Sequence, residues 1–214
     1  MSRRIPGIEG LYGITPDEAD TAALLHKVRL ALQGGMRLLQ YRNKIADAAL
    51  RLTQARALRQ LTREFSAPLI VNDDVQLAQN VDADGVHLGQ ADETLAAARA
   101  ILGRQKIIGI SCYNKPALAR AAVAGGADYV AFGAFFPSAT KPGAAKADLE
   151  MLCRARAEFG VPIVGIGGIT AQNGAELLAA GADALAVITA VFDARDIQAA
   201  ARDFEKLFIG KAAT

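Results

Sequence analysis

Residues 125–132 read GGADYVAF, and similar phrases return at intervals along the chain. Their recurrence is the first indication of the fold. The related phrases are QGGMRLLQ (33–40), VDADGVHL (81–88) and AGADALAV (180–187). Each reads as the end of a helix, a turn and the start of a strand. A glycine with positive φ commonly closes a helix, and we expect Gly34, Gly125 and Gly181 in that role. The repeat predicts helices and strands in alternation.

Eight short apolar runs, most of them ending in polar residues, extend this pattern over the chain. They are LYGIT (11–15), LLQYRNK (38–44), PLIVNDD (68–74), GVHLGQAD (85–92), IIGISC (107–112), YVAFGAFFPSATK (129–141), PIVGIGG (162–168) and LAVIT (185–189). The runs are dense in Val, Ile and Leu without strict alternation, which is typical of parallel strands covered on both faces. Segments with helical spacing lie between them, such as Leu50, Leu58, Leu61 and Phe65.

Eight strand–helix units of about 25 residues fit a compact TIM barrel, a fold that needs roughly 200 residues or more. We therefore predict a single (β/α)₈ domain over residues 1–214, with a short N-terminal extension at 1–10 and a C-terminal tail at 210–214. A doubly wound open sheet is the structural alternative. No GxGxxG motif follows the first strand, however, and the number of units favours a closed barrel.

Composition narrows the classes of function. The 24 Lys and Arg balance 22 Asp and Glu, which argues against a nucleic-acid surface. No apolar run is long enough to cross a membrane and the first residues lack a signal-peptide core, so we expect a cytoplasmic protein without membrane partners. Cys112 and Cys153 lack CxxC spacing and nearby histidines, which predicts reduced thiols. No helix face stands out as a subunit interface, so an oligomer is neither predicted nor excluded.

The carboxyl ends of barrel strands converge on one face, where such enzymes hold their reacting groups. In QYRNK, the side chains of Gln40, Arg42 and Lys44 are spaced two apart and should project to one side of an extended segment. They predict a wall with one amide and two cations. The alternative is a strand end that becomes polar as it reaches solvent.

Carboxylates follow the next two strands. Asn72 and Asp73 come directly after PLIV, and Asp92 ends GVHLGQAD. Two nearby carboxylates without His or Cys favour a hard cation, and Mg²⁺ commonly takes one or two carboxylates together with water and substrate phosphates. The alternative is that both aspartates cap the helices that follow them.

The later strand ends suggest phosphate binding. The loop at 136–146 carries Ser138, Thr140 and Lys141, which supply donors and a charge for phosphate oxygens. The glycines at 165–168 would let the backbone approach a ligand, and the eighth strand ends at 187–189 before a short helix. The alternative is that these glycines only permit tight packing.

Two further polar residues lie on strands. Ser111 ends the fifth strand but has no partner at triad-like spacing, so we do not expect a serine nucleophile. His87 lies between Val86 and Leu88, where a structural histidine is more common than a general base. The mouth as a whole predicts two anionic sites, which suits an enzyme that joins two phosphorylated molecules with release of pyrophosphate.

These motifs resemble those of the thiamine-phosphate synthase family, and the resemblance covers nearly the whole length of the chain. QYRNK resembles the Q-x-R-x-K motif of the family, IVNDD its Asn-Asp pair, GVHLGQAD its H-x-G-Q-x-D stretch and PIVGIGGI its late glycine motif. Cys112 and Tyr113 depart from the small residue and the His expected after Ser111. The family couples hydroxymethylpyrimidine pyrophosphate to a thiazole phosphate within a TIM barrel, by a dissociative substitution.

The resemblance also implies residue roles. It assigns Gln40, Arg42, Lys44 and Asn72 to the pyrimidine pyrophosphate, and Ser111 and Lys141 to its pyrophosphate group, with Arg42, Lys44, Ser111 and Lys141 as the catalytic set. It assigns Asp73 and Asp92 to Mg²⁺, and Ser138, Thr140, Gly168, Ile188 and Thr189 to the thiazole phosphate.

Three alternatives remain beside this interpretation. A thiazole tautomerase-like or regulatory homologue on the same barrel would not require the Q-x-R-x-K wall or the carboxylate pair. A sugar-phosphate isomerase or epimerase would need an acid/base pair, for which His87 and the two aspartates are the candidates. A noncatalytic binding module would show no magnesium-dependent turnover.

Overall fold

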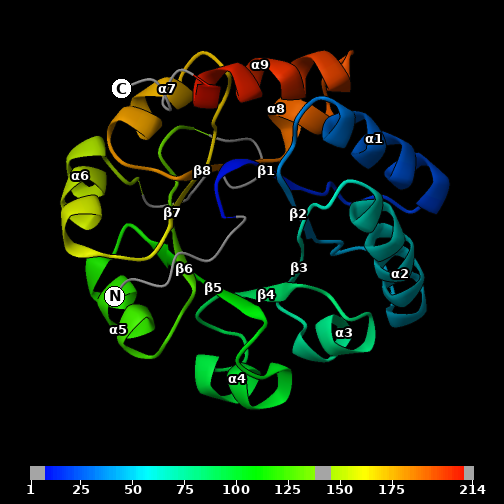
Figure 1. Ribbon diagram of the computed structural model, residues 1–214, viewed down its shortest axis with the longest axis horizontal. Helices are drawn as coiled ribbons and strands as arrows, with labels where there is room; N and C mark the ends of the chain where they lie inside the picture. The colour runs from blue at the N-terminus through cyan, green and yellow to red at the C-terminus, as the bar shows by residue number, and fades with distance from the viewer. Residues whose placement is uncertain (1–7, 138–145, 210–214) are drawn as a thin grey trace.

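The computed structural model describes residues 8–137 and 146–209, and these form one closed barrel of eight parallel strands in chain order. The first strand pairs with both the second and the eighth, which closes the sheet. Figure 1 looks into the barrel and shows the helices as a ring outside the strands. The predicted TIM barrel is therefore confirmed, and the open-sheet alternative is wrong.

Each strand is short, and the helices differ widely in length. The strands are β1 (Gly10–Ile14), β2 (Leu38–Tyr41), β3 (Leu69–Asn72), β4 (Gly85–Leu88), β5 (Ile107–Tyr113), β6 (Tyr129–Phe132), β7 (Ile163–Ile166) and β8 (Ala184–Val187). The helices are α1 (Thr21–Gln33), α2 (Ala48–Glu64), α3 (Val75–Asn80), α4 (Leu95–Leu102), α5 (Pro116–Ala124), α6 (Leu149–Glu158), α7 (Gly174–Ala179), α8 (Thr189–Phe192) and α9 (Ile197–Ile209). In the described parts of the chain, no helix is long and apolar enough to span a membrane.

Successive strand residues face two separate cores, because side chains of a strand alternate between its faces. One set packs between the strands and the helices, with Leu39, Val71 and Val86 among its members. The other set fills the inside of the barrel and includes Tyr12 and Tyr129. Polar residues that follow the strands, such as Arg42 and Asp73, lie at the carboxyl face above this filled interior.

The first and last described segments pack on the barrel. Ile8 is buried with the interior residues and β1 begins at Gly10, so the barrel starts earlier than the predicted extension at 1–10 allowed. The last helix, α9, lies beside α1 and completes the outer ring (Figure 1). The predicted tail at 210–214 lies outside the described residues.

The predicted positive φ at Gly34 and Gly125 is wrong by one position. Both cap their helices with right-handed backbone, at φ −81° and −77°. The left-handed residue follows, at Gly35 (φ 103°) and Gly126 (φ 89°), whereas Gly181 (φ 109°) is as predicted. The cap residue still completes the helical turn through its own N–H, so the chain reverses only at the next residue.

Three aspartates hold the amino ends of the strands together. Each directly precedes a strand, accepts a hydrogen bond from a backbone N–H of the strand before it, and pairs with an arginine of the helix before that strand. The three sets are Asp84 with Leu69 N (2.7 Å) and Arg59 (2.6 Å), Asp128 with Ile108 N (2.8 Å) and Arg99 (2.6 Å), and Asp183 with Ile163 N (2.8 Å) and Arg156 (2.8 Å).

In the fourth repeated phrase, Arg37 stands where the others have an aspartate, so the ion pair to the helix has its charges exchanged. Arg37 donates its backbone N–H to Leu11 of the preceding strand, as the three aspartates do to theirs, but its side chain pairs with Glu205 of α9. Each repeated phrase therefore places an ion pair to a helix before every second strand, and we call this contact the fastening.

We expect Asp128→Ala to lower the free energy of unfolding by about 2 kcal/mol, because it leaves the Ile108 N–H without its acceptor and removes the ion pair of Arg99, which then bonds only to backbone carbonyls. For a chain of this size that corresponds to a midpoint lower by roughly 4–8 °C, measured by thermal unfolding. Asp203→Ala, which breaks an exposed pair with Lys206, should change little. Equal effects of the two substitutions would contradict the proposed fastening.

Candidate active site

The end of β2 supplies three predicted residues, and they divide between two environments. Gln40 is buried and points into the barrel, where its Nε2 donates to the hydroxyl of Tyr12 at 2.9 Å. Arg42 and Lys44 lie beyond the last residue of β2 and reach charged partners at the mouth. The three side chains therefore do not form the single wall that was predicted. The amide of Gln40 lies inside the barrel, and the two cations lie above it at the mouth.

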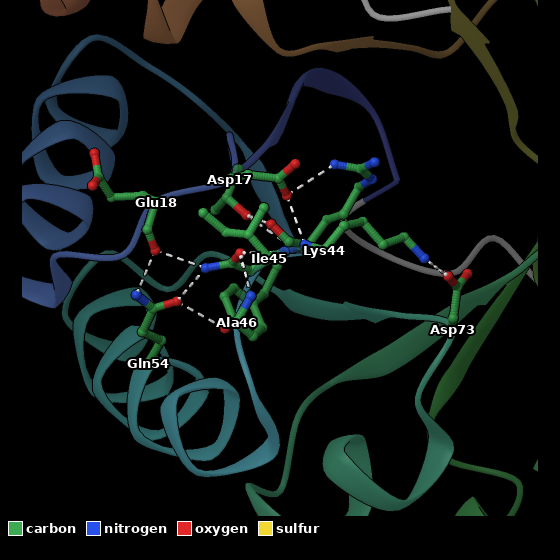
Figure 2. Close-up of polar contacts among 11 residues, drawn as sticks. Asp17, Glu18, Lys44, Ile45, Ala46, Gln54 and Asp73 are labelled. Atoms are coloured by element: carbon green, nitrogen blue, oxygen red, sulfur yellow. Dashed lines mark hydrogen bonds and ion pairs between the residues drawn. The ribbon is translucent and has the colours of Figure 1, made fainter.

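Asp17, in the loop after β1, contacts both residues, through the side chain of Arg42 and the backbone of Lys44 (Figure 2). Its Oδ1 accepts from Arg42 Nη1 at 3.2 Å and from the backbone N–H of Lys44 at 2.7 Å. Thr15 adds two bonds to the Arg42 backbone, of 2.6 and 2.8 Å. The sequence reasoning missed both residues, although LYGIT ends in a polar residue like the other runs.

A buried amide pair supports the same segment from the helix side. Asn43 Nδ2 donates to Gln54 Oε1 at 2.9 Å and to the Glu18 carbonyl at 2.7 Å, and Gln54 Nε2 donates to that carbonyl at 2.8 Å. The hydroxyl of Tyr41 also donates to Gln54 Oε1, at 2.9 Å. Figure 2 shows this group beside α2, and it leaves the segment after β2 little freedom.

Asp73 and Asp92 lie together, and Lys44 completes the cluster. Lys44 Nζ lies 2.5 Å from Asp73 Oδ2. Figure 2 marks this contact with a dashed line. Burial opposes ionisation of Asp73, but the hydrogen bonds from Lys44 and Asp92 outweigh it and lower the pKa of Asp73. Burial, and then the neighbouring Asp73 carboxylate, raise the pKa of Asp92. Two carboxylates that interact in this way titrate as a pair.

The helix-cap alternative for these two aspartates is wrong. Asp74, not Asp73, caps α3 through Leu77 N, and Thr94 caps α4. Asp73 instead has a left-handed backbone (φ 65°), and its N–H donates to the His87 carbonyl at 2.9 Å. A non-glycine residue in this conformation is held by its surroundings and is frequent at functional sites.

The carboxylate pair fits one divalent cation that takes most of its shell from elsewhere. Asp73 and Asp92 each shift the pKa of the other, and a cation between them would favour the charged form of both. The described residues contain no group of three or more His, Cys, Asp and Glu side chains arranged for a metal. Water and substrate phosphate would therefore have to supply the other ligands, as is usual for Mg²⁺.

A surface hollow gathers four of the predicted residues, Arg42, Lys44, Asn72 and Asp73, with Arg51 beside them. The residues that line it are Tyr41, Arg42, Asn43, Lys44, Arg51, Val71, Asn72, Asp73, Asp74 and Leu77. Three cations and two carboxylates on one small surface suit an anionic ligand that carries a divalent cation.

Ser111 and His87 lie in contact on neighbouring strands. His87 Nε2 lies 2.8 Å from Ser111 Oγ, and its Nδ1 lies 2.8 Å from the Tyr129 hydroxyl. His87 is buried and has both ring nitrogens in hydrogen bonds, which agrees with the structural role favoured from the sequence. Ser111 is partly exposed, and His87 Nδ1 contacts the Tyr129 hydroxyl at the position where a Ser-His-Asp triad has its carboxylate.

The opposite side of the mouth is described only in part. Gly168 has a left-handed backbone (φ 62°), and a Cβ there would lie 2.3 Å from the carbonyl of Pro137. Ile188 precedes α8, which begins at Thr189 without a side-chain cap. Gly168, Ile188 and Thr189 therefore lie where β7 and β8 end. Ser138, Thr140 and Lys141 lie outside the described residues.

The fold and the mouth together define a class of protein, a (β/α)₈-barrel enzyme that binds anionic substrates. The family model described as "Thiamine monophosphate synthase" matches residues 11–191. The chain belongs to the thiamine-phosphate synthase family, whose members are transferases.

Individual relatives agree with this assignment over nearly the full chain. The thiamine-phosphate synthase of Methylobacillus flagellatus is 58% identical over 204 residues, which is 95% of this chain and 97% of the relative. The thiamine-phosphate synthase of Thiobacillus denitrificans is 52% identical, over 96% of this chain and 97% of the relative. The solved structure of the thiamine phosphate pyrophosphorylase from Pyrococcus furiosus superposes with a TM-score of 0.86 at 37% identity. The superposition covers 95% of this chain and 97% of that one. The tautomerase-like or regulatory alternative is not supported.

We expect Asp73→Asn to lower the pKa of Asp92, because it removes the negative charge that opposes ionisation of the Asp92 carboxyl. The burial of Asp92 remains, so the shift should be partial. Carbon-13 NMR titration of the carboxyl groups measures it. Asp74→Asn removes a neighbouring charge but keeps the helix cap, and should leave Asp92 nearly unchanged. An unchanged Asp92 in Asp73→Asn would show that the two carboxylates do not interact.

Proposed function

We propose that this chain couples 4-amino-2-methyl-5-hydroxymethylpyrimidine pyrophosphate to 4-methyl-5-(2-phosphoethyl)thiazole, giving thiamine phosphate and pyrophosphate. The observation that carries the proposal is the cluster of Lys44, Asp73 and Asp92 beside Arg42. It combines cations for a phosphate group with a carboxylate pair for a divalent cation. Both substrates are small molecules, and no other partner is required.

The reaction needs stabilisation of a leaving group rather than a protein nucleophile. The bond between the pyrimidine methylene carbon and the pyrophosphate oxygen breaks first, and the thiazole nitrogen then attacks the carbon cation. Negative charge gathers on the departing pyrophosphate, so preorganised positive groups lower the barrier. Arg42 and Lys44 are such groups, because Asp17 and Thr15 fix them before any ligand arrives.

We assign Mg²⁺ to Asp73 and Asp92, with the pyrophosphate and water as its other ligands. When bound, the ion supplies Lewis-acid stabilisation of the leaving group. Lys44 lies against Asp73 on the same side and would contact the same phosphate oxygens. Asn72, the last residue of β3, adds an amide donor to this wall of the hollow.

The two remaining parts of the assignment concern the thiazole phosphate and the loop after β6. Gly168, Ile188 and Thr189 would bind the thiazole phosphate largely through backbone groups, which fits their place at the ends of β7 and β8. Ser138 and Thr140 would add hydroxyl donors to that phosphate. Ser111 and Lys141 would contact the pyrophosphate.

The direct test supplies both thiamine precursors to the purified protein, with and without Mg²⁺. We expect release of pyrophosphate and a product with the mass of thiamine phosphate, both dependent on the ion. Pyrophosphate release is measured by a coupled assay and the product by mass spectrometry. A folded protein that binds the thiazole phosphate but forms no product would contradict the proposal.

We expect Asp73→Asn and Lys141→Ala each to lower turnover at least ~100-fold, by analogy with the loss of one preorganised charge partner in other active sites. Asp203→Asn and Lys206→Ala are matched controls at the same residue types and should retain near-normal rates, because these two residues form an exposed pair on α9. Steady-state rates at saturating Mg²⁺ measure the effect. Near-normal rates in both test variants would remove the two residues from the mechanism.

A further inference from the structure

A chain of hydrogen bonds crosses the inside of the barrel from Gln40 on β2 to Ser111 on β5. We call it the interior chain. Its members are joined by Gln40 Nε2 to Tyr12 OH (2.9 Å), Tyr12 OH to Tyr129 OH (2.9 Å), Tyr129 OH to His87 Nδ1 (2.8 Å) and His87 Nε2 to Ser111 Oγ (2.8 Å). The residues at its two ends are both assigned to the pyrimidine pyrophosphate, and Ser111 in particular to the pyrophosphate group. The three residues between them have no role in the proposed reaction.

The interior chain is enclosed by the barrel. Tyr12 and Tyr129 are 1% and 0% exposed, and Gln40 and His87 are also buried. Gly109 makes room for it, since a Cβ there would lie 1.9 Å from Cζ of Tyr129. Polar groups in such a place require partners, and these residues supply them to one another.

The two tyrosine hydroxyls and a neutral His87 imidazole each have one proton to donate. Burial raises the pKa of Tyr12 and of Tyr129 well above the ordinary value, so both hydroxyls keep their protons. A neutral imidazole donates from one nitrogen and accepts at the other. Each buried hydroxyl proton also needs an acceptor, and the chain offers one only in a neighbouring member. The bonds between Tyr12 and His87 therefore all point the same way.

The first direction runs from Gln40 to Ser111. Gln40 donates through Nε2 to Tyr12, Tyr12 to Tyr129, and Tyr129 to His87 Nδ1, so that His87 Nε2–H donates to Ser111. Ser111 then keeps its own hydroxyl proton for a ligand, and Gln40 turns its carbonyl Oε1 toward the mouth. In this direction the site offers a donor at one end and an acceptor at the other.

The second direction is the reverse. Ser111 donates to His87 Nε2, and His87, Tyr129 and Tyr12 each donate onward until Tyr12 donates to the Gln40 carbonyl. Gln40 must then rotate its amide and turn the NH₂ group toward the mouth, while Ser111 has no proton left for a ligand. The two directions therefore exchange donor and acceptor at both ends together.

We propose that the interior chain couples recognition of the two ends of the pyrimidine pyrophosphate, with Tyr12, His87 and Tyr129 as positioning residues. A phosphate oxygen at Ser111 requires a donor, which selects the first direction. That direction presents the Gln40 carbonyl to the exocyclic amino group of the pyrimidine and excludes an acceptor at the same position. The inference rests on the proposed function, because it takes its ligands from that reaction.

The test uses two binding fragments and needs no turnover. The probes are the hydroxymethylpyrimidine alcohol with its 4-amino group and its 4-oxo analogue, in which the amino donor is replaced by a carbonyl acceptor. Dissociation constants are measured by calorimetry with Mg²⁺, with and without saturating inorganic pyrophosphate. In the native protein, we expect pyrophosphate to tighten binding of the amino compound at least about fivefold, the lower range of coupling between sites, and not to tighten the oxo analogue.

Tyr129→Phe keeps the ring and removes one link, and we expect it to abolish the difference that pyrophosphate makes between the two probes. Tyr12→Phe breaks the next link and serves as a second variant should the first not fold. Tyr113→Phe is the matched control, because its ring is exposed at the end of β5 and no hydrogen bond to its hydroxyl is found among the described residues. It should retain the full coupling.

Native protein without coupling, or coupling that survives in both folded tyrosine variants, would overturn the inference. A uniform weakening of both probes in Tyr129→Phe, with the pyrophosphate effect preserved, would assign these residues a structural role only and likewise overturn it. Failure of the proposed function is read separately, as absence of thiamine phosphate from native protein supplied with both precursors. The fragment binding decides the coupling in either case.

Discussion

The hydrogen bond between an aspartate carboxylate and the first backbone N–H groups of the strand before it fixes much of this barrel. Asp84, Asp128 and Asp183 each make that bond, at 2.7 to 2.8 Å, and each is held by an arginine from the ring of helices. One contact thus ties two strands and a helix at the amino end of the barrel. Because strand register decides which side chains face inward, these contacts also determine what reaches the mouth.

An ion pair to a helix recurs before every second strand, so the barrel is built from four similar pairs of strand–helix units. The pair that begins at β1 has the charges exchanged, as Arg37 and Glu205. An arginine cannot accept a hydrogen bond from a strand N–H, so this pair keeps the ion pair but loses the backbone bond. The α1 and α9 helices compensate by packing directly together at this place. Stability is thereby concentrated at the amino face, which leaves the carboxyl face for binding.

The sequence allowed the barrel and most of the mouth to be predicted, because a polar residue after an apolar run is a local signal. Gln40, Asp73, Asp92 and Ser111 were found in this way. Asp17 was missed because its role depends on the distant segment after β2, and a contact between residues 17 and 42–44 has no local pattern. The error of one residue at Gly34 has a different cause, since composition does not tell a helix cap from the left-handed residue after it.

Charge and neutrality are separated between the two layers of the site. The mouth cations are paired before any ligand arrives, Arg42 with Asp17 and Lys44 with Asp73, so a phosphate competes with carboxylates rather than with water alone. The layer below, from Gln40 to Ser111, contains no carboxylate, ammonium or guanidinium group. Such a group would fix each hydrogen bond in one direction, whereas amide, hydroxyl and neutral imidazole can each donate or accept. The lack of these charged groups is therefore what permits the direction of the interior chain to respond to the ligand above it.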